Sequence, residues 1–387
     1  MKTIMFVLIA LSIYIAGNVY LYVRCWQALE VIGRYRLWYA VAFWTIALLF
    51  IAANFIRTPG VNWPNLLSTV SSAWIAVMLY GTLALAVIDI VRLTGWAVHL
   101  RPASLVPDYP LFKLYLFAGV LALLATVFIF GYRNARFPKV TPLEIFIDKQ
   151  AGEMKELKIA MVSDLHLGRT AGIPFLRRVI DRINELDPDV VLLAGDTFDG
   201  DSEPVIRNDM CREMLRLKNR FGVYAIPGNH EYIGERFAKG SAHRAFEYLD
   251  SRGVTVLIDT AVQVNNSFYI AGRDDRSVVR RKSLADILPE VNGQPVILLD
   301  HQPFRLEEAQ QAGVDLQLSG HTHHGQMFPL HLITEKMYEQ DWGALQKGHT
   351  HYYISCGAGT WGPVLRTAGY SEIVFIKLTF SQVTTAR

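Results

Sequence analysis

One stretch of sequence, Leu-Lys-Ile-Ala-Met-Val-Ser-Asp-Leu-His at residues 157–166, sets the fold of the larger part of this chain. Its first six residues form an apolar run that predicts a buried strand, and a helical pattern follows from Pro174 to about Leu186. The alternation continues, with further strands predicted at residues 190–194, 223–226, 296–299 and 316–318 and a second helix near 205–217. Alternating strands and helices of this kind predict an α/β sheet.

Polar side chains follow each predicted strand, at the point where the strand ends. They are Asp164 and His166 after the first strand, Asp196 and Asp199 after the second, Asn229, His230 and Glu231 after the third, His301 after the fourth, and His321, His323 and His324 after the fifth. Because the carboxyl ends of the strands in an α/β sheet open onto one crevice, we expect these side chains to converge. Carboxylates, an amide oxygen and neutral imidazoles together suit manganese, iron or zinc, so the sequence predicts a metal centre there.

The chain combines two parts of very different charge content. Residues 1–132 contain 11 charged side chains, the other 255 residues contain 62, and the formal net charge is +3. This even balance argues against a nucleic-acid-binding tail, and we expect no nucleic-acid binding. The three cysteines, Cys25, Cys211 and Cys356, are widely spaced and match neither a disulfide framework nor a CxxC metal pattern.

Four stretches of the first part lack charged residues over lengths that match a bilayer. They cover residues 3–23, 37–56, 66–88 and 114–132, and a hydrocarbon core of roughly 30 Å needs about 20 apolar residues of helix. Buried helices of a soluble protein are an alternative, but such helices normally carry a polar stripe. The first stretch is also long for a signal-peptide core, and three more follow it. We therefore predict a four-span transmembrane region over residues 1–132, a linker over 133–143 that contains Pro138 and Pro142, and a globular domain over 144–387.

Charged residues flank the predicted spans, and none lies in the middle of one. Intramembrane charges mark proton relays and ion pathways, so a transporter function has little support in this sequence. The basic residues divide almost equally between the two ends of the spans, and the positive-inside rule therefore does not decide which face of the membrane carries the globular domain.

Taken together, the ordered clusters resemble the signature of calcineurin-like metallophosphoesterases, in their membrane-associated bacterial branch. The resemblance runs from about Lys158 to Leu378 and includes Leu-Asp-His-Gln-Pro at residues 299–303 and Gly-His-Thr-His-His-Gly-Gln-Met-Phe-Pro at 320–329. It implies an α/β fold, a four-layer αββα metallophosphoesterase sandwich, with a binuclear metal centre at the strand ends.

The resemblance also implies a role for each residue of the clusters. One metal ion would be held by Asp164, His166 and His323, the second by Asn229, His301 and His321, and both by Asp196. The two ions would be divalent, Mn²⁺, Fe²⁺ or Zn²⁺. His230 is the expected catalytic residue that stabilises the transition state or protonates the leaving oxygen. Asp199 would orient this imidazole, with helix capping as the alternative for Asp199.

Three residues near the predicted centre have less defined roles. Glu231 is expected to support the site without binding a metal ion. His324 is predicted either to contact substrate or to face water. Arg366 is predicted either to bind a substrate phosphate, because a guanidinium matches the geometry of that group, or to form a structural salt bridge.

The function that the resemblance implies is a membrane-anchored phosphoric ester hydrolase with two divalent metals. Four spans are more than is needed to anchor a globular domain to a membrane. This number favours a membrane-associated substrate, either a lipid or a lipid-linked molecule. A phosphodiesterase of soluble nucleotides and a non-catalytic receptor or scaffold are the alternatives, and the complete set of seven metal positions favours the enzyme. Relatives in this branch are often exported, so we expect a multi-pass protein of the cell or inner membrane whose globular domain lies on the extracytoplasmic face. The motifs leave open the oligomeric state and the choice among monoesterase, diesterase and pyrophosphatase activities.

Overall fold

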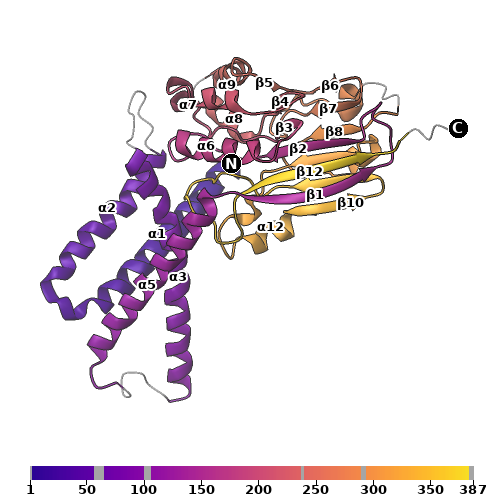
Figure 1. Cartoon of the computed structure of the whole chain (residues 1–387). Helices are drawn as coiled ribbons and strands as arrows, with labels where there is room; N and C mark the ends of the chain where they lie inside the picture. The colour runs from indigo at the N-terminus through magenta and orange to yellow at the C-terminus, as the bar shows by residue number, and fades with distance from the viewer. Residues whose placement is uncertain (1, 56–64, 100–105, 237–238, 289–292, 383–387) are drawn as a thin grey trace. The chain divides into compact units, whose positions relative to one another are not determined.

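A computed structural model describes residues 2–55, 65–99, 106–236, 239–288 and 293–382 of the chain (Figure 1). Its contacts divide the chain into two compact units. The helical unit comprises Met1–Gly131 and Gly362–Leu365, and the sheet unit comprises Tyr132–Trp361 and Arg366–Arg387.

The helical unit is built from long apolar helices. They are α1 (Lys2–Ala28), α2 (Arg36–Phe55), α3 (Asn65–Ala97) and most of α5 (Tyr109–Arg136), with a 3-10 segment, η1 (Glu30–Tyr35), between α1 and α2. Four helices in the described part of the chain are long and apolar enough to cross a membrane, which confirms the predicted number of spans. The last residue of the second predicted span, Ile56, lies outside the described residues. Large apolar side chains such as Leu48, Val87 and Ile129 are more than half exposed, as side chains that face lipid are.

The sheet unit contains two six-stranded sheets. In hydrogen-bonding order, the first contains β1 (Lys139–Ile147), β12 (Glu372–Phe380), β2 (Glu156–Val162), β3 (Val190–Leu193), β4 (Val223–Ala225) and β5 (Val254–Val256). The second contains β10 (Gly343–Lys347), β11 (Thr350–Ile354), β9 (Leu316–Ser319), β8 (Val296–Leu299), β7 (Phe268–Gly272) and β6 (Thr260–Val264). Strands β2 to β5 are parallel to one another, as are β7, β8, β9 and β11. Parallel strands bring their carboxyl ends to one edge of each sheet.

The two sheets share one apolar core, and helices cover their outer faces (Figure 1). Along β2, Ile159 and Met161 point into the core between the sheets, whereas Ala160 and Val162 point toward the helices, because successive side chains of a strand alternate in direction. Helices α6 (Ile173–Asn184) and α9 (Ser241–Asp250) pack on the first sheet. Helices α10 (Leu284–Ile287) and α11 (Glu307–Gln311) pack on the second. This arrangement confirms the predicted four-layer αββα fold.

The structure differs from the expected elements in two places. Residues 139–143, which we expected to lie in a linker, form the first half of β1, and this strand pairs with β12 along its whole length. As an edge strand, β1 tolerates Pro142 because one row of its backbone amides needs no partner. The helix expected near residues 205–217 is divided into α7 (Glu203–Arg207) and η2 (Met210–Arg216), because Asp209 between them has a left-handed backbone with a φ of 47°.

Candidate metal centre

The candidate metal ligands lie on turns that follow the strand ends. Asp164 and His166 follow β2, Asp196 follows β3, and His321 and His323 follow β9, and all five have positive φ values between 47° and 73°. Residues other than glycine adopt this conformation at a cost, and such strain is concentrated at functional sites. The strained turns therefore mark the same edge of the sheets that the polar clusters predict.

Glycine is required at two positions where one of these turns passes close to the carboxylate of a candidate metal ligand. A Cβ atom on Gly228 would lie 2.1 Å from Asp196 Oδ1, and one on Gly320 would lie 2.3 Å from Asp164 Oδ2. Both distances are far shorter than any contact between unbonded atoms. Only glycine therefore allows the two carboxylates to occupy their positions.

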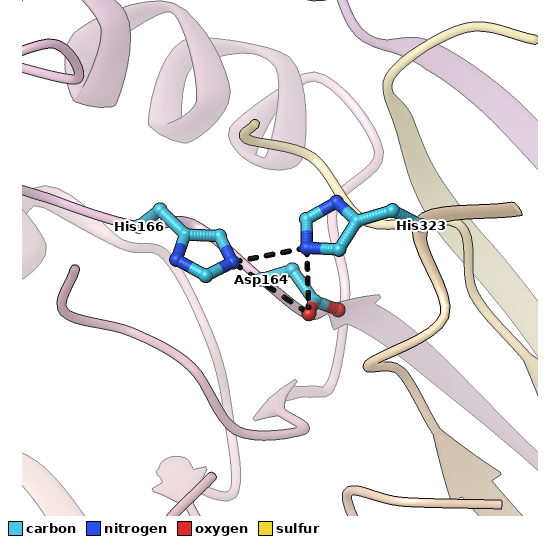
Figure 2. Close-up of side chains that lie close together, drawn as sticks. All are labelled: Asp164, His166 and His323. Carbon is cyan, nitrogen blue, oxygen red and sulfur yellow. Dashed lines mark hydrogen bonds and ion pairs between the residues drawn. The ribbon is translucent and has the colours of Figure 1, made fainter. Parts of the chain in front are cut away.

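Asp164, His166 and His323 form one group of possible metal-binding atoms (Figure 2). His166 Nε2 lies 3.0 Å from His323 Nε2. Asp164 Oδ1 lies 3.3 Å from His323 Nε2 and 3.9 Å from His166 Nε2. All three residues are buried, so two imidazole nitrogens and one carboxylate oxygen converge away from solvent.

Asp196, His301 and His321 form a second group. His301 Nδ1 donates to the Ala194 carbonyl at 2.8 Å, which directs His301 Nε2 toward Asp196 Oδ2 at a distance of 3.2 Å. Asp196 Oδ2 also lies 3.8 Å from His166 Nε2 of the first group. Asp196 therefore stands between the two groups.

The atoms of both groups fit a divalent metal ion. Asn229 Oδ1 is one of the buried acceptors that have no hydrogen-bond partner among the residues that the structure describes. A buried acceptor without a donor costs roughly 1–3 kcal/mol. A divalent cation is a partner that imidazole, amide and carboxylate acceptors share, so its binding would satisfy these atoms together.

Local charges and burial shift the pKa values of the donor groups, mostly in the direction that metal binding needs. Burial lowers the pKa values of His321 and His323 to about 4, so both imidazoles are neutral at pH 7. Burial opposes ionisation of Asp164 and Asp196, but the neighbouring histidines outweigh it and hold both pKa values below the usual range. His301 differs: although burial acts against it, Asp196 raises its pKa well above the usual value. A metal ion at His301 would therefore displace a proton.

A third group joins Asp199 to two histidines. Asp199 Oδ1 lies 3.4 Å from His230 Nδ1 and 3.5 Å from His166 Nδ1. Burial lowers the pKa of His230, but the carboxylates of Asp199 and Asp196 outweigh this effect and raise it to about 8. Asp199 is thus placed to orient two imidazoles, whereas sequence analysis related it to His230 only.

Glu231 supports two of the turns through hydrogen bonds. Its carboxylate accepts hydrogen bonds from the amides of Phe198, at 2.9 Å, and Gly228, at 2.7 Å. Burial, together with the charge of Asp196, raises the pKa of Glu231 to about 7. The side chain connects the turn after β3 with the turn after β4.

Arg366, predicted either to bind a substrate phosphate or to form a structural salt bridge, has a buried guanidinium that bonds to main-chain carbonyls. Nη2 donates to Cys356 at 2.5 Å and to Gly359 at 2.7 Å, and Nη1 donates to His323 at 3.3 Å. Nη2 also lies 3.1 Å from the ring nitrogen His323 Nδ1. Arg366 therefore supports the loop and the imidazole of a candidate ligand. Phosphate binding by Arg366 stays a prediction.

His324, predicted to contact substrate or to face water, is tied to a neighbouring loop. Its Nδ1 lies 2.8 Å from Asp341 Oδ2, and its ring centroid lies 4.9 Å from that of Trp342. Substrate contact by His324 stays a prediction.

One strand-end cluster was not predicted from the sequence. Arg273, Asp274 and Asp275 follow β7 and are buried, and Asp275 Oδ2 accepts a hydrogen bond from Gln302 Nε2 at 2.9 Å, beside His301. A signal was present, because the run Phe-Tyr-Ile-Ala-Gly-Arg-Asp-Asp at 268–275 repeats the apolar–glycine–acid order of Leu-Leu-Ala-Gly-Asp at 192–196.

Comparison with known proteins identifies the family to which this chain belongs. A family model described as calcineurin-like phosphoesterase matches residues 157–325. A transmembrane protein with metallophosphoesterase domain from Danio rerio is 35% identical over 67% of this chain and 62% of its own length. An uncharacterized metallophosphoesterase from Helicobacter pylori strain J99 is 31% identical over 67% of this chain and 68% of its own length. The chain belongs to the calcineurin-like phosphoesterase family.

This metallophosphoesterase also resembles a relative along nearly its whole length. An uncharacterized metallophosphoesterase from Campylobacter jejuni is 28% identical over 97% of this chain and 98% of its own length, so the match includes the helical unit. Membership confirms the predicted family, and it is consistent with the predicted class, a metal-dependent phosphoester hydrolase. The chain spans less than two thirds of the length of the zebrafish relative, at 62%.

Proposed function

We propose that this chain is a membrane-anchored phosphoesterase that holds two divalent metal ions at the edge of its sheets. The observation that carries the proposal is the position of Asp196, whose Oδ2 lies 3.2 Å from His301 Nε2 and 3.8 Å from His166 Nε2. A carboxylate between two groups of ligands offsets the repulsion between two cations that lie about 3.5–4 Å apart.

Each group of side chains has a defined part in this function. One ion would be held by Asp164, His166 and His323, the second by Asn229, His301 and His321, and both by Asp196. When bound, the ions supply Lewis-acid stabilisation of the phosphoryl oxygens and a water of lowered pKa. In the metal-free protein, Asp199 and Asp196 raise the pKa of His230 to about 8, which favours the protonated imidazole that would donate a proton to the leaving oxygen. Asp199 orients this imidazole through Nδ1, which leaves Nε2 for the proton transfer.

Metal analysis and one substitution test the proposal. Elemental analysis of the purified protein should find two divalent ions per chain. His230→Ala should lower turnover of phenyl phosphate, whose leaving oxygen needs a proton, by about 10²–10⁴-fold, since general acid catalysis contributes that much, while the metal content stays near two ions. At most one ion per chain, with activity that a chelator does not affect, would contradict the proposal. Loss of both ions in His230→Ala would identify His230 as a ligand instead.

For the substrate, we propose a phosphorylated lipid or lipid-linked molecule. The last turn of α5, one of the four helices that can cross a membrane, belongs to the sheet unit. There the Ser371 amide donates to the Asn134 carbonyl at 2.9 Å, and Asn134 Nδ2 donates to the Arg366 carbonyl at 3.3 Å. Since the Arg366 guanidinium in turn contacts His323, the end of this helix and a candidate metal ligand share one set of contacts. This connection favours a phosphoryl group presented near a membrane surface.

A lipid profile distinguishes this substrate class from soluble nucleotides. Cells that lack the protein should accumulate a phosphorylated lipid, and the wild-type chain should reverse the accumulation. The His230→Ala chain serves as the matched control, because it should insert into the membrane normally and yet fail to reverse the accumulation. An unchanged lipid profile together with accumulation of a soluble nucleotide would refute the lipid proposal and leave the phosphoesterase proposal standing.

We propose further that the sheet unit lies on the extracytoplasmic face, in line with the export that the resemblance implies. Val279 is a suitable reporter because it is fully exposed. Of the native cysteines, Cys211 and Cys356 are buried, so Cys25→Ser removes the accessible thiol. In that background, Val279→Cys should react with a membrane-impermeant maleimide in intact cells. Protection until the cells are lysed would place the sheet unit in the cytoplasm.

A further inference from the structure

Five large apolar side chains are exposed in one region of the sheet unit. They are Phe328, Leu332, Ile333, Met337 and Trp361, each between 50% and 60% exposed, and we call them the α12 patch because three of them belong to α12 (His331–Met337). Other exposed apolar side chains, such as Leu215 and Val279, belong to separate elements. Single exposed apolar residues are ordinary, but a contiguous group marks an interaction site.

Local contacts hold the α12 patch together. Its three helical residues lie within an arc of roughly 140°, since successive residues of an α-helix turn by about 100°. Phe328 lies beside His331 at the start of α12, with ring centroids 5.5 Å apart. Trp361 is joined to the segment before Phe328 by two hydrogen bonds of 2.9 Å between its main chain and the Gln326 side chain. Phe328 is therefore held at the start of α12, and the main chain of Trp361 is held at the segment that leads into Phe328.

The α12 patch is connected to the metal centre through Asp341. Asp341 Oδ2 accepts a hydrogen bond from Thr334 of α12 at 2.7 Å and lies 2.8 Å from His324 Nδ1. The Asp341 carbonyl accepts a hydrogen bond from the Thr322 hydroxyl at 2.5 Å. Since Thr322 and His324 flank His323, the position of α12 is coupled to the loop that carries two candidate ligands.

We propose that the α12 patch inserts into the interfacial region of the lipid bilayer that the helical unit spans. The sheet unit is joined to a helix that can cross a membrane, because the last turn of α5, which ends at Arg136, belongs to the sheet unit. The patch combines tryptophan and phenylalanine with aliphatic side chains, the composition of segments that lie in a membrane interface. Lys336 on α12 is exposed, and its long side chain can reach headgroup phosphates. Insertion would turn the metal centre toward lipid headgroups, so the inference deepens the proposed lipid substrate and rests on it in that respect.

Fluorescence quenching in the full chain tests the insertion without any turnover. The protein with Cys25→Ser and Met337→Cys is labelled with nitrobenzoxadiazole and reconstituted into phosphatidylcholine–phosphatidylglycerol vesicles that contain doxyl-labelled lipid. Glu247→Cys on α9, whose side chain is 63% exposed, is the matched control. Quenching should be at least about threefold stronger at position 337 than at 247, because only an inserted label meets the doxyl group. Equal quenching at the two positions would overturn the proposal.

Two leucine substitutions provide a second control. Leu332→Glu places a charge in the α12 patch and should reduce quenching at position 337 by about half or more, because a carboxylate in the interface opposes insertion. Leu215→Glu makes the same change at an exposed leucine of η2 and should leave the quenching unchanged. Energy transfer between labels on two copies, without lipid quenching, would show self-association and overturn the proposal. Because quenching needs no catalysis, a failed insertion and a failed phosphoesterase function give different results.

Discussion

Replacing Arg366 by methionine should destabilise the sheet unit by an amount that its contacts allow us to work out. Methionine keeps much of the side-chain volume and removes every donor. The Cys356 and Gly359 carbonyls then lose the guanidinium, whereas the His323 carbonyl keeps the Gln326 amide at 2.9 Å. Two buried acceptors without donors, at about 1–3 kcal/mol each, lower the free energy of unfolding by roughly 2–6 kcal/mol. With a shift of about 2–4 °C per kcal/mol in a domain of this size, the unfolding midpoint should fall by at least about 4 °C.

The same substitution should weaken metal binding. Arg366 Nη1 donates to the His323 carbonyl at 3.3 Å, and Nη2 donates to the Cys356 and Gly359 carbonyls, so the guanidinium holds the loop that carries this candidate ligand. Residues that hold a metal ligand in position contribute about 10–100-fold to metal affinity. Titration of Zn²⁺ into chelator-treated protein should therefore give a dissociation constant raised by about 10–100-fold in Arg366→Met. Arg366→Lys, which retains one charged donor nitrogen, should recover only part of this loss.

Arg216→Met is the matched control, because Arg216 is exposed and pairs with Asp181 and Glu213 on the surface. We expect it to change the free energy of unfolding by less than about 0.5 kcal/mol and to leave Zn²⁺ affinity unchanged. Arg366→Met with wild-type stability and wild-type affinity would show that Arg366 supports neither the sheet unit nor the metal site. Reduced stability with wild-type affinity would limit Arg366 to a structural role and separate it from His323.

Three further predictions concern the turns of the metal centre. Asp196→Asn removes the carboxylate that lies between the two groups, and elemental analysis should find that the protein loses both ions; retention of two ions would exclude a shared ligand. In metal-free protein, Asp199→Asn should lower the pKa of His230 from about 8 toward its ordinary value, because the lost carboxylate favours the protonated imidazole, and the NMR titration of His230 measures the change directly. Gly228→Ala should reduce metal content and stability, since its Cβ would lie 2.1 Å from Asp196 Oδ1, whereas Gly172→Ala, with its nearest atom at 3.9 Å, should be close to neutral in both measurements.

Local sequence was sufficient to predict much of the candidate centre. Asp164, Asp196 and His301 each follow a short apolar strand directly, so the strand pattern and the position of the polar residue are read from the same few residues. The cluster after β7 follows the same rule and was missed only because β7 itself was not predicted. The four membrane helices could be predicted equally well, since length and the absence of charge define a span without reference to other segments.

Other features depend on residues that are distant in the chain. The sequence of β1 contains Pro142 and is typical of a linker. The segment is a strand only because β12 pairs with it. In this pair Glu372 lies opposite Lys139, 233 residues away in the chain. Glu372 itself is a buried carboxylate that accepts hydrogen bonds from Thr141, Trp342, Tyr353, Ser355 and Cys356. No local pattern around an acid in a strand predicts such a set of donors.

Composition and short spacing are properties of neighbouring residues, so they were enough to predict which chemical groups this protein brings to its site and that four apolar helices accompany them. Tertiary structure alone decided how those groups are used. It placed Asp199 beside both His166 and His230, buried Arg366 next to His323, and linked α12 through Asp341 to the loop that carries His323. The physical reason is that direction, burial and charge environment depend on contacts between segments far apart in the chain, and these contacts exist only after the two sheets have packed.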